Sequence, residues 1–233
     1  MNEIRRYDSL DSTNLEALRL ARAGEQGPIW VVARTQSAGR GRRGRTWVSP
    51  PGNLYATWLT PAPGPRAAEL GFVAALAAAD VVRDCVPHVC VTVKWPNDVL
   101  ADRRKIAGIL LEREGRALAI GIGMNLAHHP VETEFPATSL AETGQAPEPE
   151  DALARLAARM AAWYEVWGRD GFEPIRVQWR ARAFGLGGPI VARVADGELR
   201  GVFDDLDGDG ALLIRAGGIV SRITAAELFF GDR

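Results

Sequence analysis

Arginine and glycine alternate in the stretch TQSAGRGRRGRTW, which runs from Thr35 to Trp47. Glycines let a backbone approach a ligand closely and adopt unusual dihedral angles. Arginine forks pair with carboxylate or phosphate through two parallel hydrogen bonds. The stretch therefore fits an anion-binding loop, although by itself it also fits a solvated surface loop or an RNA-binding Gly/Arg segment. A Walker loop is excluded, because the Gly-Lys-Ser/Thr sequence is missing.

A second candidate for chemistry is KWPNDVL, residues 94–100. Lys94 ends an expected strand, a prolyl turn follows, and Asn97 and Asp98 lie at the exit of the turn. A buried lysine and a carboxylate at one strand end can handle phosphate and magnesium. The alternative is an ordinary capped β-turn, since Asn and Asp favour turns.

Two further motifs place small or charged residues in apolar strands. Lys105 begins KIAGILLE, where a strand-edge gatekeeper is the simpler interpretation of a lysine. Gly108 in the same run indicates that another group approaches the backbone there. GIGMN, residues 121–125, has two glycines where a strand would favour bulky residues.

Composition limits the classes of function. The 233 residues carry a formal net charge of -1, which argues against general nucleic-acid binding because such proteins present a broad basic surface. Cys85 and Cys90 do not have zinc-site spacing, and the N-terminus shows no secretory signal, so a cytoplasmic protein is expected. The most apolar run, from Leu70, is too short to span a bilayer. No membrane partner is expected, and the run predicts a buried, Ala-rich helix.

Periodicity predicts the elements that must position these motifs. Thr13 and Glu16 suit a capping box at the start of a helix that stops near Gly24. Residues 127–150 have the composition of a loop. The other predicted elements are strands at 29–35, 53–60, 89–96, 105–112 and 116–126, and helices at about 66–84 and 151–167. After residue 184 the pattern changes to short strands with Asp-Gly and Gly-Gly turns, which is typical of a small β-barrel or sandwich.

The order of the motifs is more specific than any one of them. DSTN, TQSAGRGRRGRTW, KWPND, KIAGILLE and GIGMN together closely resemble the biotin protein ligases, also called biotin–[acetyl-CoA-carboxylase] ligases. The resemblance runs from about Ser12 to Asn125, and GALLIR and AAEL near the C-terminus fit the small β domain of that family more loosely. It implies an α+β fold. A catalytic domain with a mixed sheet, related to class II aminoacyl-tRNA synthetases, would occupy residues 1–184, and an SH3-like β-barrel residues 185–233.

The same resemblance implies an ATP-dependent ligase. Such enzymes make biotinyl-5′-AMP from biotin and MgATP, release pyrophosphate, and pass biotin to one lysine of a carrier protein, such as the biotin carboxyl carrier of acetyl-CoA carboxylase. The implied cofactors are ATP and Mg²⁺. The implied partners are biotin, ATP and the carrier protein, and a homodimer is left open.

Site residues follow from the resemblance position by position. The catalytic set is Arg40, Lys105 and Asp98, and Asp98 would also bind magnesium or assist the incoming lysine. The implied biotin-binding residues are Ser12, Thr13, Asn14, Gln36, Gly39, Arg40, Gly41, Arg42, Lys105 and Gly108. The implied ATP- and adenylate-binding residues are Arg40, Arg42, Arg43, Arg45, Trp47, Lys94, Asn97, Lys105 and Asn125.

The Gly/Arg stretch would act as a lid in such an enzyme. Arg40 and Arg42 match residues at the biotin carboxylate and the adenylate phosphate, and their loop is expected to be mobile when empty and to order over the ligand. Closure would exclude water, which matters because a mixed anhydride hydrolyses easily.

Two departures from the family pattern affect these expectations. Many bacterial relatives carry an N-terminal helix-turn-helix and repress a biotin operon, whereas here the catalytic domain is expected to begin almost at Met1, so no DNA partner is expected. Some relatives have an arginine four residues after the Glu of the C-terminal strand. Gly231 follows Glu227 at that distance here, which puts that arginine's role near ATP in doubt.

Two alternative functions remain at this stage. A lipoate- or octanoyl-protein ligase shares the fold. A nucleic-acid-binding module would use the Gly/Arg loop, but it would also need a wider basic surface and aromatic platforms.

Overall fold

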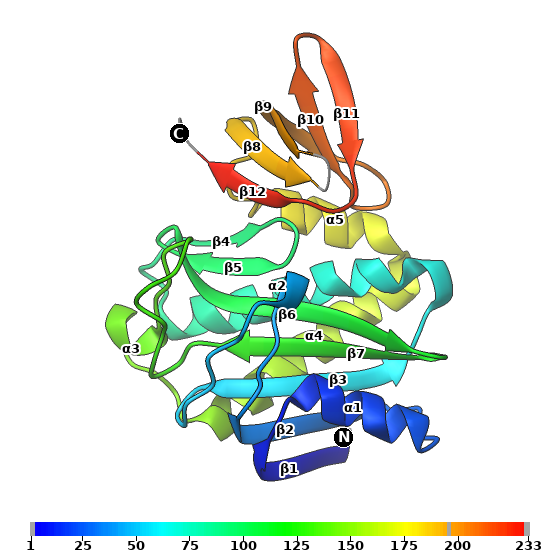
Figure 1. Ribbon diagram of the computed structural model, residues 1–233, viewed down its shortest axis with the longest axis vertical. Helices are drawn as coiled ribbons and strands as arrows, with labels where there is room; N and C mark the ends of the chain where they lie inside the picture. The colour runs from blue at the N-terminus through cyan, green and yellow to red at the C-terminus, as the bar shows by residue number, and fades with distance from the viewer. Residues whose placement is uncertain (1–2, 195–196, 231–233) are drawn as a thin grey trace.

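A mixed seven-stranded sheet forms the larger part of the molecule (Figure 1). The computed structural model describes residues 3–194 and 197–230, so Gly231 lies outside the described residues. The strand order is β1-β2-β3-β7-β6-β5-β4, in which β1 and β2 are parallel and all other neighbours are antiparallel. The strands are β1 Glu3–Leu10, β2 Ile29–Gln36, β3 Leu54–Pro61, β4 Val91–Lys94, β5 Asp98–Ala101, β6 Arg104–Glu114 and β7 Ala117–Met124.

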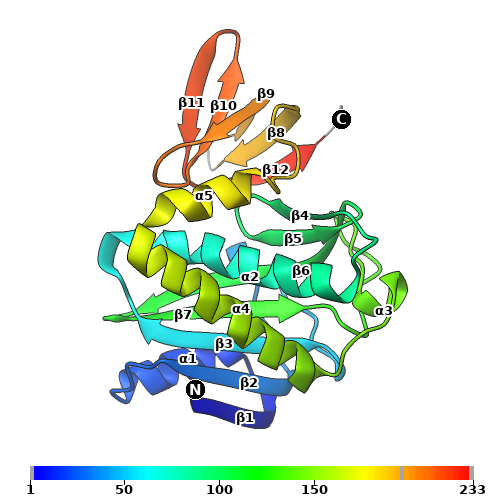
Figure 2. The ribbon, with the colours of Figure 1, turned by 180° about the vertical axis from the view of Figure 1, so that it is seen from behind.

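Helices cover the two faces of this sheet unequally. On one face lie α2 (Glu69–Cys85) and α4 (Pro149–Asp170), which together screen most of the sheet (Figure 2). Every residue of α2 from 70 to 82 is buried, because its small alanines let the helix pack closely against the strands. The opposite face carries only α1 (Thr13–Arg22), which packs on a separate small cluster that includes Ile29 and Val31. The remainder of that face is free for a site.

A second, antiparallel sheet follows α5 (Phe172–Arg180). Its order is β11-β10-β9-β8-β12, and it stacks above the β4–β5 end of the larger sheet (Figure 1). The strands are β8 Pro189–Val194, β9 Gly197–Leu206, β10 Leu212–Ala216, β11 Ile219–Ile223 and β12 Glu227–Phe230. The predicted boundary after residue 184 falls in the segment between α5 and β8.

The β9–β10 turn docks the small sheet onto the large one. The indole N–H of Trp95 donates to the carbonyl of Gly210 at 3.0 Å, and Trp95 is buried. Gly210 has a φ of +82°, and a Cβ there would lie 2.7 Å from the ring of Phe72. Only glycine fits this contact without strain. Buried apolar residues of both sheets belong to one continuous hydrophobic core.

The predicted elements are mostly confirmed, with one local error. The structure confirms the α+β class with a mixed sheet and a small β domain. The capping box at Thr13 and Glu16 is wrong: the helix N-cap is Ser12, which makes no side-chain capping bond, and Thr13 is the first helical residue. The Thr13 hydroxyl bonds Gln36 instead, so a tertiary partner replaces the local one.

Four elements were not predicted from the sequence: β1, β5, α5 and the short α3 (Leu140–Thr143) inside the expected loop. In β1, at the sheet edge, charged side chains interrupt the apolar alternation, and β5 has only four residues directly after the prolyl turn. Among the described residues, no helix is long and apolar enough to cross a membrane.

Candidate active site

A cavity of about 410 Å³ opens on the sheet face that carries α1. Its walls come from the start of α1, the Gly/Arg loop, the β4–β5 turn, β6, β7, the loop at 127–139 and β12. All predicted site residues line it except Gly39: Ser12, Thr13, Asn14, Gln36, Arg40, Gly41, Arg42, Arg43, Arg45, Trp47, Lys94, Asn97, Asp98, Lys105, Gly108 and Asn125. Motifs spread over more than a hundred residues of sequence therefore meet in one place.

Glycines form the floor of the cavity. Gly108 on β6 pairs in register with Gly123 on β7, and Gly121 lies two residues before Gly123 on the same face. A Cβ on Gly123 would stand 2.5 Å from the ring of Trp47, and a Cβ on Gly121 would overlap the side-chain oxygen of Asn14. These distances explain the two glycines of GIGMN, because another group lies directly on the backbone at both positions.

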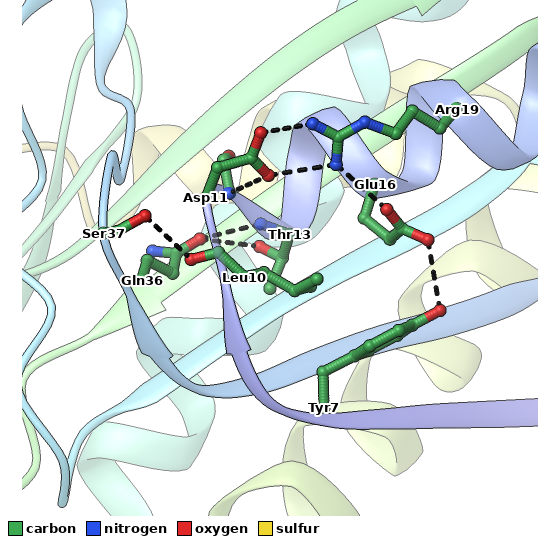
Figure 3. Close-up of polar contacts among 9 residues, drawn as sticks. Tyr7, Leu10, Asp11, Thr13, Glu16, Arg19, Gln36 and Ser37 are labelled. Carbon is green, nitrogen blue, oxygen red and sulfur yellow. Dashed lines mark hydrogen bonds and ion pairs between the residues drawn. The ribbon is translucent and has the colours of Figure 1, made fainter.

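One end of the cavity is a buried array of neutral polar groups at the start of α1. Gln36 Oε1 accepts from the backbone N–H of Thr13 at 2.8 Å and from its hydroxyl at 3.2 Å (Figure 3). The Thr57 hydroxyl donates to Asn14 Oδ1 at 2.7 Å and lies 2.8 Å from Thr13 Oγ1. Because each group is held by another, the array presents fixed donors and acceptors to a ligand.

The start of α1 is also fixed from outside. A chain of polar contacts joins Asp11 to Arg19, Arg19 to Glu16, and Glu16 to Tyr7 on β1 (Figure 3). The Ser37 amide donates to the carbonyl of Leu10 at 2.9 Å. The first turn of α1 is therefore tied to β1 through Tyr7, and Gln36 at the end of β2 holds Thr13.

The Gly/Arg loop folds back on itself as a small hairpin. The Trp47 amide donates to the carbonyl of Gly39 at 2.8 Å, and the Gly41 amide donates to the carbonyl of Arg45, also at 2.8 Å. Gly39 is required by this hairpin rather than by the cavity, since a Cβ there would lie 2.3 Å from the carbonyl oxygen of Trp47.

The arginines of the loop point to different partners. Arg40 Nη2 forms an ion pair with Glu112 Oε1 at 2.8 Å, and Arg42 Nη1 donates to Asn97 Oδ1 at 3.4 Å. Burial lowers the pKa of the Arg42 guanidinium from its ordinary value, and the negative charge of Asp98 acts in the opposite direction. Arg42 is therefore the loop cation that enters the cavity most deeply.

A ring of four charges joins two loops to the small β domain. Arg45 pairs with Glu227 on β12 and lies 3.9 Å from Glu134 in the 127–139 loop. Arg193 on β8 pairs with Glu134 at 3.3 Å and lies 3.9 Å from Glu227. The alternating signs make each residue a partner of two others, so the loops on either side of the cavity mouth are tied to β8 and β12.

A cluster of cations surrounds one carboxylate at the other end of the cavity. Lys105 Nζ lies 2.7 Å from Asp98 Oδ1, and the Lys94 ammonium sits 3.6 Å from the centre of the Phe135 ring. Lys94 is only 6% exposed, and burial lowers its pKa to about 8, although the charge of Asp98 opposes this shift. Lys94 and Lys105 both line this cavity. They are the only two lysines in the chain, which otherwise uses arginine for its cations.

The donors around Asp98 do not form a complete metal site. The part of the chain that the structure describes contains no group of three or more His, Cys, Asp or Glu side chains that could hold a metal ion. Asp98 and the amide oxygen of Asn97 are the oxygen donors at this point of the cavity. One or two protein oxygens fit a magnesium ion that is carried mainly by substrate phosphates.

Several residues of the site were not predicted from the sequence. Thr57, Glu112 and Glu134 looked like ordinary strand or loop residues, and only the three-dimensional pairing gives them partners in the cavity wall or its supports. Asn125 lines the cavity, but its side-chain amide donates to the carbonyl of Thr138 at 3.0 Å. This bond closes the base of the 127–139 loop.

Comparison with known proteins gives a consistent result. The model of the biotin/lipoate A/B protein ligase family matches residues 7–127. The chain is 48% identical to the biotin–[acetyl-CoA-carboxylase] ligase of Paracoccus denitrificans, over 95% of this chain and 98% of that protein. It is 33% identical to the bifunctional ligase/repressor BirA of Escherichia coli, over 94% of this chain and 71% of that protein.

A solved structure shares the whole architecture. The biotin protein ligase from Aquifex aeolicus in complex with biotin and ATP superimposes with a TM-score of 0.87 at 25% identity, covering 98% of this chain and 99% of that one. The similarity extends over both sheets, so it includes every element that lines the cavity.

Proposed function

The chain belongs to the biotin/lipoate A/B protein ligase family, and we propose that it activates biotin with ATP and transfers it to a lysine of a carrier protein. One observation carries this proposal: a single cavity has fixed neutral polar groups at one end and a cluster of cations at the other. The neutral end suits the ureido head of biotin. The cationic end suits the carboxylate of biotin together with the phosphates of ATP.

The first step joins two negatively charged groups. An oxygen of the biotin carboxylate attacks the α-phosphorus of ATP, the bond to the bridging oxygen breaks, and pyrophosphate leaves. Arg40, Arg42 and Lys105 reduce the repulsion between carboxylate and phosphate, and they stabilise the negative charge of the transition state. The glycines of β6 and β7 let the Trp47 ring and the Asn14 side chain lie directly on the strands, and these two side chains form part of the wall around the reacting groups.

Magnesium would enter with the nucleotide. Asp98, with the Asn97 amide oxygen beside it, would supply the protein ligands. Bound there, the ion would neutralise charge that accumulates on the leaving pyrophosphate. In its protonated form, the Lys94 side chain would hold a phosphate oxygen.

The second step transfers biotin. The neutral amine of the carrier lysine attacks the carbonyl carbon of biotinyl-5′-AMP, an amide bond forms, AMP leaves, and the amine loses a proton. We propose that Asp98, which lines the cavity beside Lys105, accepts that proton. We propose that the carrier is the biotin carboxyl carrier protein of acetyl-CoA carboxylase or a related carboxylase, and that the reaction takes place in the cytoplasm.

Lipoate and octanoate ligases belong to the same family model, but the named relatives and the ligand-bound structure favour biotin. The test is direct product analysis. Protein incubated with biotin, MgATP and a carrier domain should yield biotinyl-5′-AMP and a carrier heavier by one biotinyl group at a single lysine. Labelling of the same carrier only by lipoyl or octanoyl groups would overturn the assignment.

A further inference from the structure

Glu112 joins two parts of the site without itself lining the cavity. It lies near the end of β6, and its side chain is 20% exposed. One carboxylate oxygen, Oε2, accepts from Asn14 Nδ2 at 2.9 Å. The other, Oε1, forms the ion pair with Arg40 at 2.8 Å. The carboxylate thus bridges the neutral end of the cavity and the Gly/Arg loop.

The Asn14 side of this bridge is rigid. Asn14 is buried, its Oδ1 accepts from Thr57, and its Nδ2 also donates to the carbonyl of Leu110 at 3.2 Å. A carboxylate held in this way keeps its second oxygen in a fixed position. The loop side is less constrained, since the Arg40 side chain is 42% exposed. Because Asn14 holds Oε2 of Glu112, Oε1 has a fixed position, and its ion pair with Arg40 determines where the guanidinium lies.

The ion pair leaves Arg40 able to bind a ligand. Among the described residues, Glu112 is the one carboxylate that pairs with Arg40, and the contact involves a single nitrogen of the guanidinium. A guanidinium carries five N–H donors in a planar fork. Arg40 can accordingly hold Glu112 and an anionic ligand group at the same time.

We propose that Glu112 is a positioning residue that anchors Arg40 over the ligand and so slows the escape of the acyl-adenylate. This inference rests on the function proposed above. Arg45, which pairs with Glu227, ties the other end of the same loop to the small β domain. The loop is thereby held at both ends, and Glu112 is its inner anchor.

The opposite role would have an opposite consequence. If Glu112 competed with the ligand for Arg40, removing its charge would free the arginine and retain the adenylate longer. The direction of the change therefore decides between anchor and competitor.

The experiment compares Glu112→Gln with Glu114→Gln. Glutamine at 112 has one side-chain oxygen, so when that oxygen accepts from Asn14 its NH2 group faces Arg40, and the negative charge that pairs with the guanidinium is gone. Glu114 is a matched control, because it is two residues further along β6 and pairs with Arg22 on α1 at 2.7 Å, away from the loop. Each protein is loaded with biotinyl-5′-AMP, and the dissociation rate of the adenylate is measured by dilution into excess unlabelled adenylate.

We expect Glu112→Gln to speed dissociation about fivefold, the change typical of losing a partly exposed charged pair. Glu114→Gln should stay within about twofold of the wild type. An unchanged or slower rate for Glu112→Gln overturns the inference. A wild-type protein that binds no biotinyl-5′-AMP would instead overturn the proposed function, so the two failures are distinguishable.

A double-mutant cycle separates positioning from general weakening of the fold. In an Arg40→Gln background, Glu112→Gln should cause no further increase in the rate, because the partner on which it acts is already gone. Fully additive effects would show that Glu112 acts through something other than Arg40. The thermal midpoint of the ligand-free protein is recorded for every variant.

Discussion

Burial of Lys94 gives the protein a pH dependence that can be measured without any ligand. The ammonium lies beside the rings of Phe135 and Phe230, the residue is only 6% exposed, and burial lowers its pKa to about 8. An unfolded lysine has a pKa near 10.4. Between these values the unfolded chain binds a proton that the folded chain has lost, so the free energy of unfolding rises with pH in this window.

The size of the effect follows from the same two values. Below pH 8 Lys94 is protonated in both the folded and the unfolded chain. The two pKa values differ by more than two units, and each unit corresponds to about 1.4 kcal/mol, so burial of the charge destabilises the folded protein by on the order of 3 kcal/mol. Part of that cost disappears between pH 7 and pH 9, which should stabilise the wild type by about 1 kcal/mol. Tyr55, whose pKa burial raises to about 12, acts with the opposite sign but only above about pH 10.

Urea unfolding at several pH values tests this expectation in the wild type and in Lys94→Met. Methionine keeps an apolar stem against Phe135 but has no proton to lose, so the rise between pH 7 and pH 9 should be absent from the variant. Saturating MgATP should also reduce the rise in the wild type, because phosphate charge favours the ammonium form. Identical pH profiles for both proteins without ligand would refute the idea that Lys94 is a desolvated cation.

Three other outcomes are expected. Gly123→Ala puts a Cβ 2.5 Å from the Trp47 ring, so it should cost about 1–3 kcal/mol of stability or displace the indole, and biotin-dependent adenylation should fall at least tenfold in a steady-state assay. Glu227→Arg should raise the KM for ATP by repelling Arg45. The double variant Arg45→Glu with Glu227→Arg, which exchanges the two charges, should recover part of the loss. No recovery would show that this ion pair does not contribute to ATP binding. Arg43→Lys places a primary amine at the cavity wall of a chain whose two native lysines are both in the site. Mass spectrometry should then detect self-biotinylation at residue 43. Absence of this modification would mean that the adenylate does not reach this wall.

The sequence indicated most of the cavity because the site uses residues with unusual local requirements. Glycines inside strands, as in GIGMN, and arginines among glycines are costly patterns that need a reason. Their order along the chain carried the resemblance, and the resemblance supplied the fold. Each of these features depends on residue type and spacing, which a single sequence displays.

What the sequence did not indicate depends on pairing across the fold. Glu112 looks like an ordinary strand residue, and only the position of α1 and of the loop brings Asn14 and Arg40 to its two oxygens. The capping box at Thr13 failed for a related reason, since the Thr13 hydroxyl bonds Gln36, more than twenty residues away, instead of a backbone N–H of its own helix. Arg193 reaches the loops only because the small β domain docks beside them.

Biotin-dependent exchange of labelled pyrophosphate into ATP tests the central claim most directly, because it reports the formation of the acyl-adenylate without needing the carrier protein. We expect exchange that requires both biotin and magnesium, that is not supported by lipoate or octanoate, and that falls sharply in Lys105→Met. Exchange with lipoate or octanoate but not with biotin, or exchange without any of these carboxylic acids, would show that the protein does not activate biotin.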